Sequence, residues 1–322
     1  MSQQLRSRLD AIAPQLHANG RRIRGLRRLS GGASQETWAF DLRLDAGRLL
    51  PLVLRRAAGG APGAGSAGLA AEARLLAVAF EHGVAVPPLA YVLPAEAGLG
   101  EGFVMQHVAG ETLGARIVRA PALARARESL ARQCGQALAR IHQLPLQRLP
   151  ALRTAPAAVE LAHYEAQHRC FDMPRPVFEL AMRWLKANDV GAPPRATLVH
   201  GDLVDADGLR AVLDWELAHI GDPMEDLGWL CVNSWRFGRS ELPVGGFGRL
   251  EDLFDGYRAA GGTVDAARVH YWQRLGTLKW GVMCEAMGQS YLSGERRSVE
   301  RAAIGRRASE VEIDLLEWLE SS

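Results

Sequence analysis

The sequence predicts an α+β protein with two lobes, in which a small antiparallel sheet with one bracing helix precedes a mostly helical region. Residues 36–42 alternate apolar and polar side chains, and residues 51–56 form an apolar run that ends in two cations, as in strands. After Leu113, apolar residues recur at helical spacing. A strand followed by a short polar connection and a helix is typical of a hinge. We therefore expect lobes at residues 1–104 and 113–322, joined by a hinge at 105–112.

Composition limits the classes of partner. The 322 residues are 48% apolar and 23% charged, which is ordinary for a globular protein. A net charge of +2 argues against nucleic acid or an acidic membrane surface as the main partner. The four cysteines, Cys134, Cys170, Cys231 and Cys284, lack metal-site spacing and predict reduced thiols rather than disulfides. Met1–Leu16 is typical of an amphipathic helix rather than a signal peptide, and no stretch is apolar enough to span a bilayer, so we expect a cytoplasmic protein.

Two acidic residues follow strand-like runs. Asp202 comes after the apolar pair 198–199 and a His-Gly turn, and Asp214 ends the run Leu209–Leu213. Taken singly, an Asp at a strand end is more often a structural acceptor for turn amides. Taken together, the pair fits phosphoryl transfer, in which one Asp orients the attacking hydroxyl and the other holds Mg²⁺ on the nucleotide phosphates.

The motifs around these residues resemble a known family. His200-Gly201-Asp202, then Leu213-Asp214-Trp215-Glu216, then Gly221-Asp222-Pro223 with Asp226-Leu227, resemble the aminoglycoside phosphotransferase family, whose relatives are protein kinases and choline kinases. The chain's closing pattern, from Leu292 to the helix with Val311 and Leu315, is similar to the branch also found fused to acyl-CoA dehydrogenases. The resemblance implies a protein-kinase-like fold, ATP or GTP as donor, Mg²⁺, and a small hydroxylated acceptor.

The resemblance also implies a nucleotide site. A small-residue turn lets backbone amides approach phosphate oxygens closely, and the family's nucleotide loop has the place of Ser30, Gly31, Gly32, Ala33 and Ser34. Arg55 takes the place of the kinase strand lysine, and Glu72, on the buried side of the next helix, would pair with it. At the hinge, Met105 would line the pocket, while the Gln106 carbonyl and the Val108 amide would hydrogen-bond the base.

For catalysis, the resemblance makes Asp202 the base and Asp214 the metal ligand. His200, Glu216, Asp222 and Asp226 would support them. Asp222 also has the sequence signature of a helix start, because proline and glutamate follow it at the first helical positions. We interpret His142 as a packed or capping residue, and His163 and His168 as solvated.

One departure concerns the loop after Asp202. Relative to the family pattern about six residues are absent, including the Asn that binds the second metal. The run Leu209–Trp215 should pair with a partner across an Asp-Gly turn, yet only Leu203 and Val204 precede that turn, which is too short for a strand. Either the protein has lost this loop, or a stretch of the natural chain is absent from this sequence. Asp205 or Asp207 could substitute as a ligand in a rearranged loop.

The acceptor is predicted from charge. Arg236, Arg274 and Lys279 follow or flank tryptophans in the helical region and would suit a hydroxy acid or hydroxyacyl thioester better than a polycationic drug. Two alternatives stay open. A pseudokinase, which binds nucleotide without turnover, would fit the shortened loop. A metal-dependent hydrolase using Asp202 and Asp214 would release phosphate without an acceptor, but it leaves Arg55 and Glu72 unexplained.

Overall fold

The computed structural model describes residues 2–29, 35–57, 66–201 and 209–320. The chain divides into two compact units, which we describe separately. Unit 1 comprises Met1–Gly110, Leu144–Arg153 and Leu209–Ala218, and unit 2 comprises Glu111–Gln143, Thr154–Gly208 and His219–Ser322. An antiparallel sheet in the N-terminal part and a mostly helical remainder confirm the predicted fold class.

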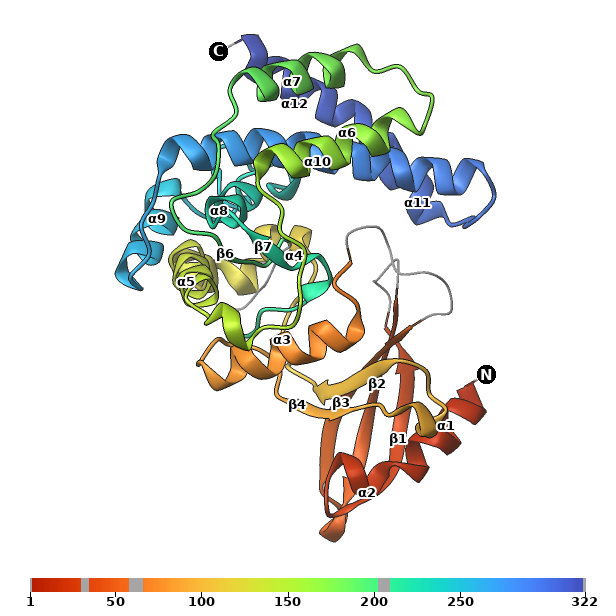
Figure 1. Ribbon diagram of the computed structural model, residues 1–322. Helices are drawn as coiled ribbons and strands as arrows, with labels where there is room; N and C mark the ends of the chain where they lie inside the picture. The colour runs from red at the N-terminus through yellow and green to blue at the C-terminus, as the bar shows by residue number, and fades with distance from the viewer. Residues whose placement is uncertain (1, 30–34, 58–65, 202–208, 321–322) are drawn as a thin grey trace. The chain divides into compact units, whose positions relative to one another are not determined.

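Unit 1 is built on a five-stranded antiparallel sheet with the strand order β1-β2-β3-β5-β4 (Figure 1). The strands are β1 (Gly20–Arg28), β2 (Gln35–Leu44), β3 (Leu49–Ala57), β4 (Leu89–Val92) and β5 (Gly102–Gln106). β3 is the central strand, where Arg55 pairs with Thr37 of β2 on one side and with Phe103 of β5 on the other. The register therefore holds Arg55 between two neighbouring strands.

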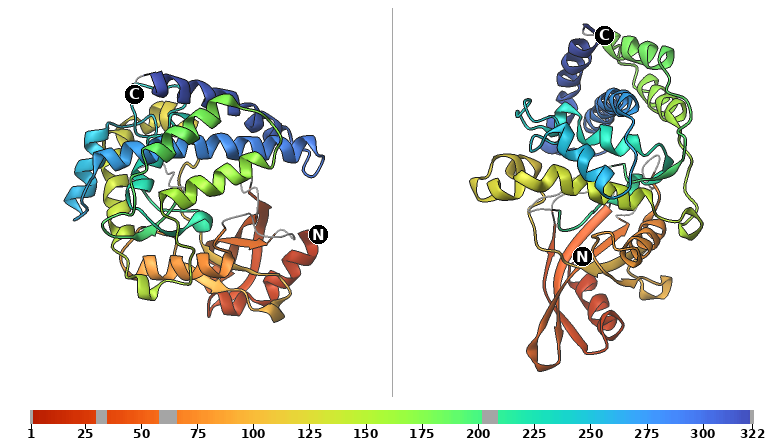
Figure 2. Two further views of the ribbon diagram at one scale, coloured as in Figure 1. Left: turned by 45° about the horizontal axis from the view of Figure 1, so that its top comes forward. Right: turned by 90° about the vertical axis from the view of Figure 1, so that its left-hand side faces the viewer.

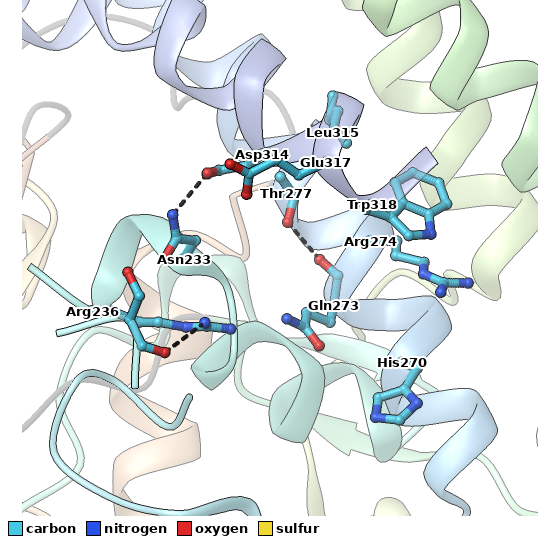
Figure 3. Close-up of a pocket in the computed structure, with 11 residues that line it drawn as sticks. Asn233, Arg236, His270, Gln273, Arg274, Thr277, Asp314, Leu315, Glu317 and Trp318 are labelled. Carbon is cyan, nitrogen blue, oxygen red and sulfur yellow. Dashed lines mark hydrogen bonds between the residues drawn. The ribbon is translucent and has the colours of Figure 1, made fainter. Parts of the chain in front are cut away.

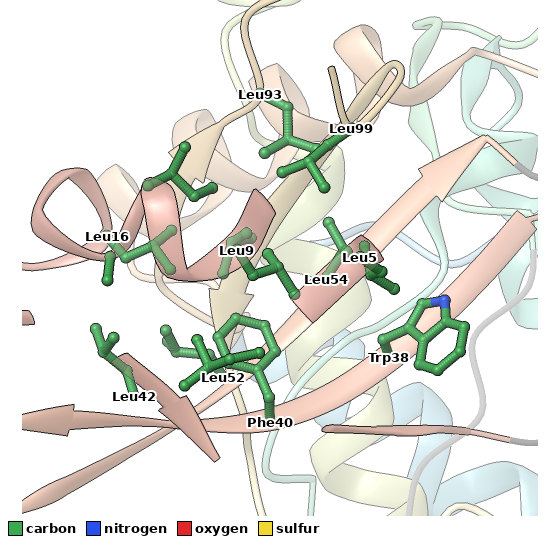
Figure 4. Close-up of a cluster of buried hydrophobic side chains, with 14 of the residues drawn as sticks. Leu5, Leu9, Leu16, Trp38, Phe40, Leu42, Leu52, Leu54, Leu93 and Leu99 are labelled. Atoms are coloured by element: carbon green, nitrogen blue, oxygen red, sulfur yellow. The ribbon is translucent and has the colours of Figure 1, made fainter. Parts of the chain in front are cut away.

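The N-terminal helices cover one face of this sheet. The predicted helix over Met1–Leu16 is present as α1 (Ser2–Ala11) and the single turn α2 (Ala13–Leu16). Leu5 and Leu9 of these helices pack against Phe40 and Leu52 of the sheet in one buried cluster (Figure 4). Burying each such side chain stabilises the fold by about 1.5–3 kcal/mol. This cluster is the main apolar core of the unit.

Helix α3 (Leu69–Glu81) contacts β3, β4 and β5. Val53 is buried although it points to the face opposite Leu52, so both faces of the central strand are covered. Glu72 lies on the buried side of α3, as predicted, with 1% of its surface exposed. Phe80 near the end of the helix is 53% exposed, whereas its neighbours Val78 and Ala79 are fully buried.

The strand predicted over Leu209–Leu213 is also wrong. These residues have no regular secondary structure, and the Val212 amide donates a 2.7 Å hydrogen bond to the Ala85 carbonyl. The two residues before the Asp-Gly turn are too few to form the pairing strand that the run would need. The strand predicted at Leu198 and Val199 does form, as β6 (Thr197–Val199), and it pairs within unit 2 with β7 (His219–Gly221).

Unit 2 is otherwise helical and is arranged around one long helix, α10 (Ala266–Leu292) (Figures 1 and 2). The other helices are α4 (Gly114–Arg119), α5 (Ala124–His142), α6 (Ala157–Arg169), α7 (Pro176–Ala187), α8 (Met224–Leu230), α9 (Leu250–Ala259), α11 (Val299–Arg306) and α12 (Ala308–Glu320). Helices α6, α7, α8, α11 and α12 all contact α10, and α5 packs against α9. The helical character predicted after Leu113 is confirmed, and the predicted closing helix with Val311 and Leu315 is α12.

Helices α10 and α11 approach each other at two glycines. A Cβ atom added to Gly305 would lie 2.6 Å from the Cα atom of Gly288, whereas one added to Gly288 would lie 3.4 Å from the Cα atom of Gly305. The missing side chain at Gly305 thus allows the close approach. In the described residues, no helix has the length and apolar character that crossing a membrane would require.

Candidate functional site

Arg55 is the centre of a charged cluster in unit 1. Its Nη2 atom lies 2.9 Å from Asp214 Oδ1 and 3.3 Å from Glu72 Oε2. Strand β3, the first turn of α3 and the segment Leu209–Ala218 each supply one of these side chains. The residues expected to contact phosphate and metal are therefore brought together around one guanidinium.

Gln35 belongs to the same cluster, and the sequence analysis missed it. Its Oε1 atom accepts hydrogen bonds of 3.0 and 2.8 Å from Arg55, and its Nε2 atom donates to Glu72 at 2.7 Å and to Glu216 at 3.5 Å. The strand register explains this position. Thr37 is directly opposite Arg55, so Gln35, two residues earlier, points to the same face as a diagonal neighbour. Gln35 thus fixes the orientation of both Arg55 and Glu72.

The cluster carries more negative than positive charge, since three carboxylates surround one guanidinium. Burial raises the pKa of Glu72 to about 7, and the charges of Asp214 and Glu216 add to this effect, although Arg55 and Gln35 oppose it. Burial alone would lower the pKa of Arg55, but Asp214 and Glu72 outweigh it and raise that pKa. Arg55 therefore stays charged, and a further cation beside the carboxylates would be favourable.

Asp214 is held in an unusual backbone conformation. Its φ and ψ angles are 65° and 67°, in the left-handed region that aspartate tolerates better than most residues. Trp215, which is 1% exposed, follows it and begins one turn of 3-10 helix at Trp215–Leu217. The Asp214 side chain remains 41% exposed, so its carboxylate is fixed at one end and accessible at the other.

Of the predicted base-binding residues, Met105 and Gln106 are the last two residues of β5 in unit 1, and Val108 comes shortly after the strand. Met105 is 8% exposed, while Gln106 is exposed. The Val108 amide makes no hydrogen bond within the described residues, which leaves this donor available for a ligand.

In unit 2, Asp226 braces the backbone that leads to Asp202. Its carboxylate accepts hydrogen bonds of 2.8 Å from the amides of His200 and Gly201 and lies 2.9 Å from His142 Nε2. Burial alone would raise the pKa of Asp226, but these partners lower it to about 2. His142 is buried, as predicted, and its Nδ1 atom lies 2.8 Å from the Tyr257 hydroxyl. Asp226 and His142 therefore hold the His-Gly turn in place.

Asp222 has the supporting geometry that was expected of it. Its Oδ1 atom accepts a 3.0 Å hydrogen bond from the Met224 amide at the start of α8. Its Oδ2 atom accepts bonds of 2.8 Å from Arg268 Nε and 2.7 Å from Trp272 Nε1. The fully buried carboxylate thus ties α8 to α10.

The structure separates the three predicted acceptor residues. Arg236 and Arg274 line one cavity (Figure 3). Lys279 does not line it. Lys279 is 4% exposed, lies 3.4 Å from Glu225 Oε1 and sits 4.8 Å from the centre of the Trp229 ring. These contacts satisfy the charge of Lys279 inside unit 2 and leave it buried away from that cavity.

The prediction that His168 is solvated is wrong. His168 is 4% exposed, and its Nδ1 atom lies 2.7 Å from Glu285 Oε2 on α10. The reason is that His168 lies on the face of α6 that packs against α10, where a buried carboxylate requires a partner. The sequence of α6 has no clear apolar stripe that would reveal this face.

Two groups of predicted residues, the glycine-containing turn Ser30–Ser34 and the base Asp202 with the loop to Gly208, lie outside the described residues.

The chemistry of the donor set suits magnesium. Within the described chain, no three side chains converge into a ready metal cage. Mg²⁺ usually binds through one or two carboxylates together with substrate phosphates and waters. Asp214 offers an accessible carboxylate in a cluster with excess negative charge. The residues present therefore fit this ion.

Comparison with known proteins agrees with the predicted family. The model of the phosphotransferase enzyme family matches residues 25–263. No curated protein matches the sequence.

Several solved structures share the fold. A proposed aminoglycoside phosphotransferase from Ralstonia eutropha JMP134 has a TM-score of 0.73 at 17% identity and covers 98% of each chain. A choline/ethanolamine kinase family protein from Mesorhizobium loti has a TM-score of 0.65 at 22% identity, with 98% of this chain and 95% of that chain covered. A type I macrolide 2'-phosphotransferase has a TM-score of 0.61 at 19% identity, with 98% and 96% covered.

Proposed function

Because the chain belongs to the phosphotransferase enzyme family, we propose that it transfers the γ-phosphoryl group of ATP, with Mg²⁺, to a hydroxyl group of a small molecule. The observation that supports this most directly is the cluster in which Arg55 meets Glu72, Gln35 and Asp214. Phosphoryl transfer uses a phosphate-binding cation and a metal-binding carboxylate in this arrangement.

The chain's own residues would divide the work. Arg55 would contact the nucleotide phosphates, with Glu72 and Gln35 fixing its guanidinium, and the Ser30–Ser34 backbone would cover the phosphates. Asp214 would hold Mg²⁺, which neutralises charge on the phosphates. Asp202 would orient the acceptor hydroxyl and accept its proton as oxygen bonds to the γ-phosphorus and the bond to the β-phosphate oxygen breaks. Met105, Gln106 and Val108 would receive the base.

Other residues of the site would have supporting roles in the same reaction. Asp226, Asp222 and His200 would keep the turn before Asp202 rigid, so that its carboxylate keeps its position during the reaction. Glu216 would stabilise Gln35.

We also propose that residues 105–112 form the hinge that joins the two lobes. The protein would work in the cytoplasm, and neither nucleic acid nor a membrane would be its partner. It would belong to the branch of the family that is also found fused to acyl-CoA dehydrogenases.

The identity of the nucleotide donor, ATP or GTP, has to be determined by experiment. Structures with a similar fold include the phosphotransferase APH(2")-IIIa with GDP and kanamycin and an amicoumacin kinase with AMP-PNP, so both purine nucleotides are candidate donors.

The experiment is a thermal-shift titration with ATP and with GTP, each with and without Mg²⁺. We expect Mg²⁺ to strengthen ATP binding and Asp214→Asn to remove that gain, because the accessible carboxylate is lost. Ligand at one hundred times its Kd stabilises a protein by about 2.7 kcal/mol, which gives a readily measured shift. Glu128→Gln, a substitution on an exposed face of α5, is the control and should behave as wild type. Equal shifts with and without Mg²⁺ in the wild-type protein would count against the proposal.

A second candidate is a pseudokinase that binds nucleotide without turnover. The observation that favours it is the short stretch between Asp202 and Gly208, which lacks an Asn. Intact mass and the gene sequence test this directly. A longer natural loop that contains Asn removes the reason for the alternative, and metal-independent ATP binding by the short chain supports it. Phosphate release without any acceptor would instead favour a hydrolase.

A further inference from the structure

The sheet of unit 1 carries a group of exposed arginines near its β1 edge, which we name the arginine face. Its members, on β1 and β2, are Arg22, Arg24, Arg27 and Arg43. Strand β1 is the last strand on this side of the sheet (Figure 1). Within the described ranges, none of the four arginines makes an ion pair or a side-chain hydrogen bond. Their positive charges are therefore available to a ligand.

The register of β1 against β2 places all four arginines on the same side of the sheet. The cross-strand pairs are Arg22 with Arg43, Arg24 with Asp41, and Arg27 with Ala39. Residues directly opposite each other in antiparallel strands point to the same side, and positions 39, 41 and 43 share one side because side chains alternate along β2. Phe40 and Leu42 point to the other side, where they join the buried cluster of the N-terminal helices. The arginine face is thus the side away from those helices.

A bulge in β1 keeps Arg27 on this side. Arg24 and Arg27 are three residues apart, and in a regular strand such residues point to opposite sides. The register shifts between them, so both lie opposite residues of β2 that share a side. Gly25 lies in the shifted segment with a φ of 61°, which glycine adopts without strain. The bulge therefore directs one more guanidinium away from the apolar cluster and onto the arginine face.

The arginine face continues toward the charged cluster around Arg55. One cross-strand row of register pairs consists of Arg27, Ala39, Val53 and Met105. This row ends at Met105, the predicted wall of the base pocket. Arg55 lies two residues after Val53 on β3 and points to the same side. The arginine face and the predicted nucleotide-binding residues are therefore parts of one surface within unit 1.

The two ends of this surface carry opposite charge. Around Arg55, three carboxylates leave an excess of negative charge. On the arginine face, four guanidiniums stand against one opposing carboxylate, that of Asp41. A nucleoside triphosphate with one bound Mg²⁺ is still an anion, so the carboxylates repel it and the arginine face attracts it. The arginine face thus offsets a repulsion that would otherwise slow the approach of the nucleotide.

We propose that the arginine face attracts the Mg²⁺-bound nucleoside triphosphate and raises the rate constant, kon, with which it associates with the site at Arg55. This rests on the proposed phosphotransfer and adds a second group of residues to nucleotide binding. The attraction acts through the charge of exposed side chains rather than through fixed hydrogen bonds. It therefore weakens with salt and affects kon more than the dissociation rate constant, koff.

Coulomb's law gives the size of the expected effect. From strand spacing and rise, the Cα atoms of Arg27 and Arg24 lie roughly 12 and 17 Å from that of Arg55. For a ligand with about two net negative charges in water, these two arginines together raise kon about threefold at an ionic strength of about 10 mM, where the Debye length is about 30 Å. At about 1 M the Debye length is about 3 Å, and the effect disappears.

Two double variants remove the same amount of charge from different places. Arg24→Gln/Arg27→Gln removes two guanidiniums from the arginine face. Arg8→Gln/Arg21→Gln is the matched control, because Arg8 lies on α1, which covers the other side of the sheet, and Arg21 near the far end of β1 is paired with Asp45. Any difference between the two variants therefore reports the position of the charge rather than the net charge of the protein.

Stopped-flow fluorescence with Mg²⁺ and a methylanthraniloyl-labelled ATP measures kon and koff at ionic strengths between about 10 mM and 1 M. We expect Arg24→Gln/Arg27→Gln to lower kon about threefold at the lowest ionic strength, to leave koff unchanged, and to match the wild type at the highest. The control double variant should lower kon by less than half as much. Arg24→Lys/Arg27→Lys, which keeps both charges, should keep the wild-type kon, and a thermal midpoint confirms that each variant is folded.

The outcomes separate this inference from the proposed function. If the labelled ATP binds but the two glutamine double variants have equal kon, the inference is overturned and the proposed function stands. A rise in koff with an unchanged kon also overturns it, because the arginines would then contact the bound nucleotide. An unchanged kon together with binding of a short single-stranded DNA by the wild type alone would assign the arginine face to nucleic acid instead. A protein without Mg²⁺-dependent nucleotide binding contradicts the proposed function and this inference with it.

Discussion

The Glu72 side chain is held in a fixed position, yet its carboxyl group gains or loses a proton near neutral pH. It accepts a hydrogen bond from Gln35 and lies beside Arg55, yet two other carboxylates and its own burial raise its pKa to about 7. Its protonation therefore changes near neutral pH, where most glutamates in proteins are already charged.

This predicts a pH-dependent stability. Between the unfolded pKa of about 4.3 and the folded value of about 7, the folded protein holds a proton on Glu72 that the unfolded chain has released, so raising the pH favours unfolding. The loss amounts to about 4 kcal/mol when complete. Glu72→Gln should therefore gain stability relative to wild type as the pH rises from 4.5 to 7. Urea unfolding at several pH values measures this difference.

Glu128→Gln is again the matched control, because it changes an exposed carboxyl to an amide on a helix. A difference between Glu72→Gln and wild type that stays constant with pH would contradict the raised pKa.

At this scale the sequence predicted Arg55, Glu72 and Asp214 from motifs, and the structure brings them within ion-pair distance. It could not predict Gln35, because that contact depends on the register of β2 against β3 rather than on any local pattern. The predicted role of Lys279 as an acceptor residue disagrees with its buried position for a related reason. Its cationic charge is visible in the sequence, but the buried Glu225 that pairs with it comes from another helix.

At the scale of elements, the contact between α10 and α11 depends on a glycine. Gly305→Ala should destabilise the protein by about 1–3 kcal/mol, since its Cβ would overlap the α10 backbone at 2.6 Å. Gly288→Ala is the matched control. Its Cβ would meet Gly305 at an ordinary 3.4 Å, and alanine favours a helix interior over glycine by about 0.5–1 kcal/mol.

Chemical unfolding of both variants measures the two effects, which should have opposite signs. Equal destabilisation by the two substitutions would mean that helix separation, rather than overlap at one position, sets the cost.

The strands at residues 36–42 and 51–56 and the helical character after Leu113 could be predicted because the patterns that indicate them are local. The strand predicted over Leu209–Leu213 could not be corrected from its own residues, which are aliphatic and strand-like. A strand needs a partner of similar length, and only the short stretch before Gly208 indicates that none is available. The prediction failed because pairing is a property of two segments.

At the scale of the whole molecule, unit 1 is assembled from three separate stretches of the chain. The segment Leu209–Ala218 supplies both the buried Trp215 and the Asp214 carboxylate that pairs with Arg55. The fragment Met1–Gly110 lacks both and should unfold at lower urea concentration and less cooperatively than the intact protein, because Arg55 loses a partner and part of the interior is missing.

Trp38 is the only tryptophan of that fragment, so its fluorescence reports the unfolding of the sheet directly. Amide hydrogen exchange of the same strands, measured in the fragment and in the intact protein, provides the comparison. Identical transitions in the two proteins would refute this dependence on the later segment.

The same arrangement has a consequence for the order of synthesis. A ribosome that has completed residue 110 must add about a hundred further residues before Asp214 and Trp215 exist. At roughly 5–20 residues per second this takes on the order of ten seconds. During that interval Arg55 and Glu72 have been synthesised without their third partner, so the charged cluster around Arg55 cannot be completed until residue 214 has been added.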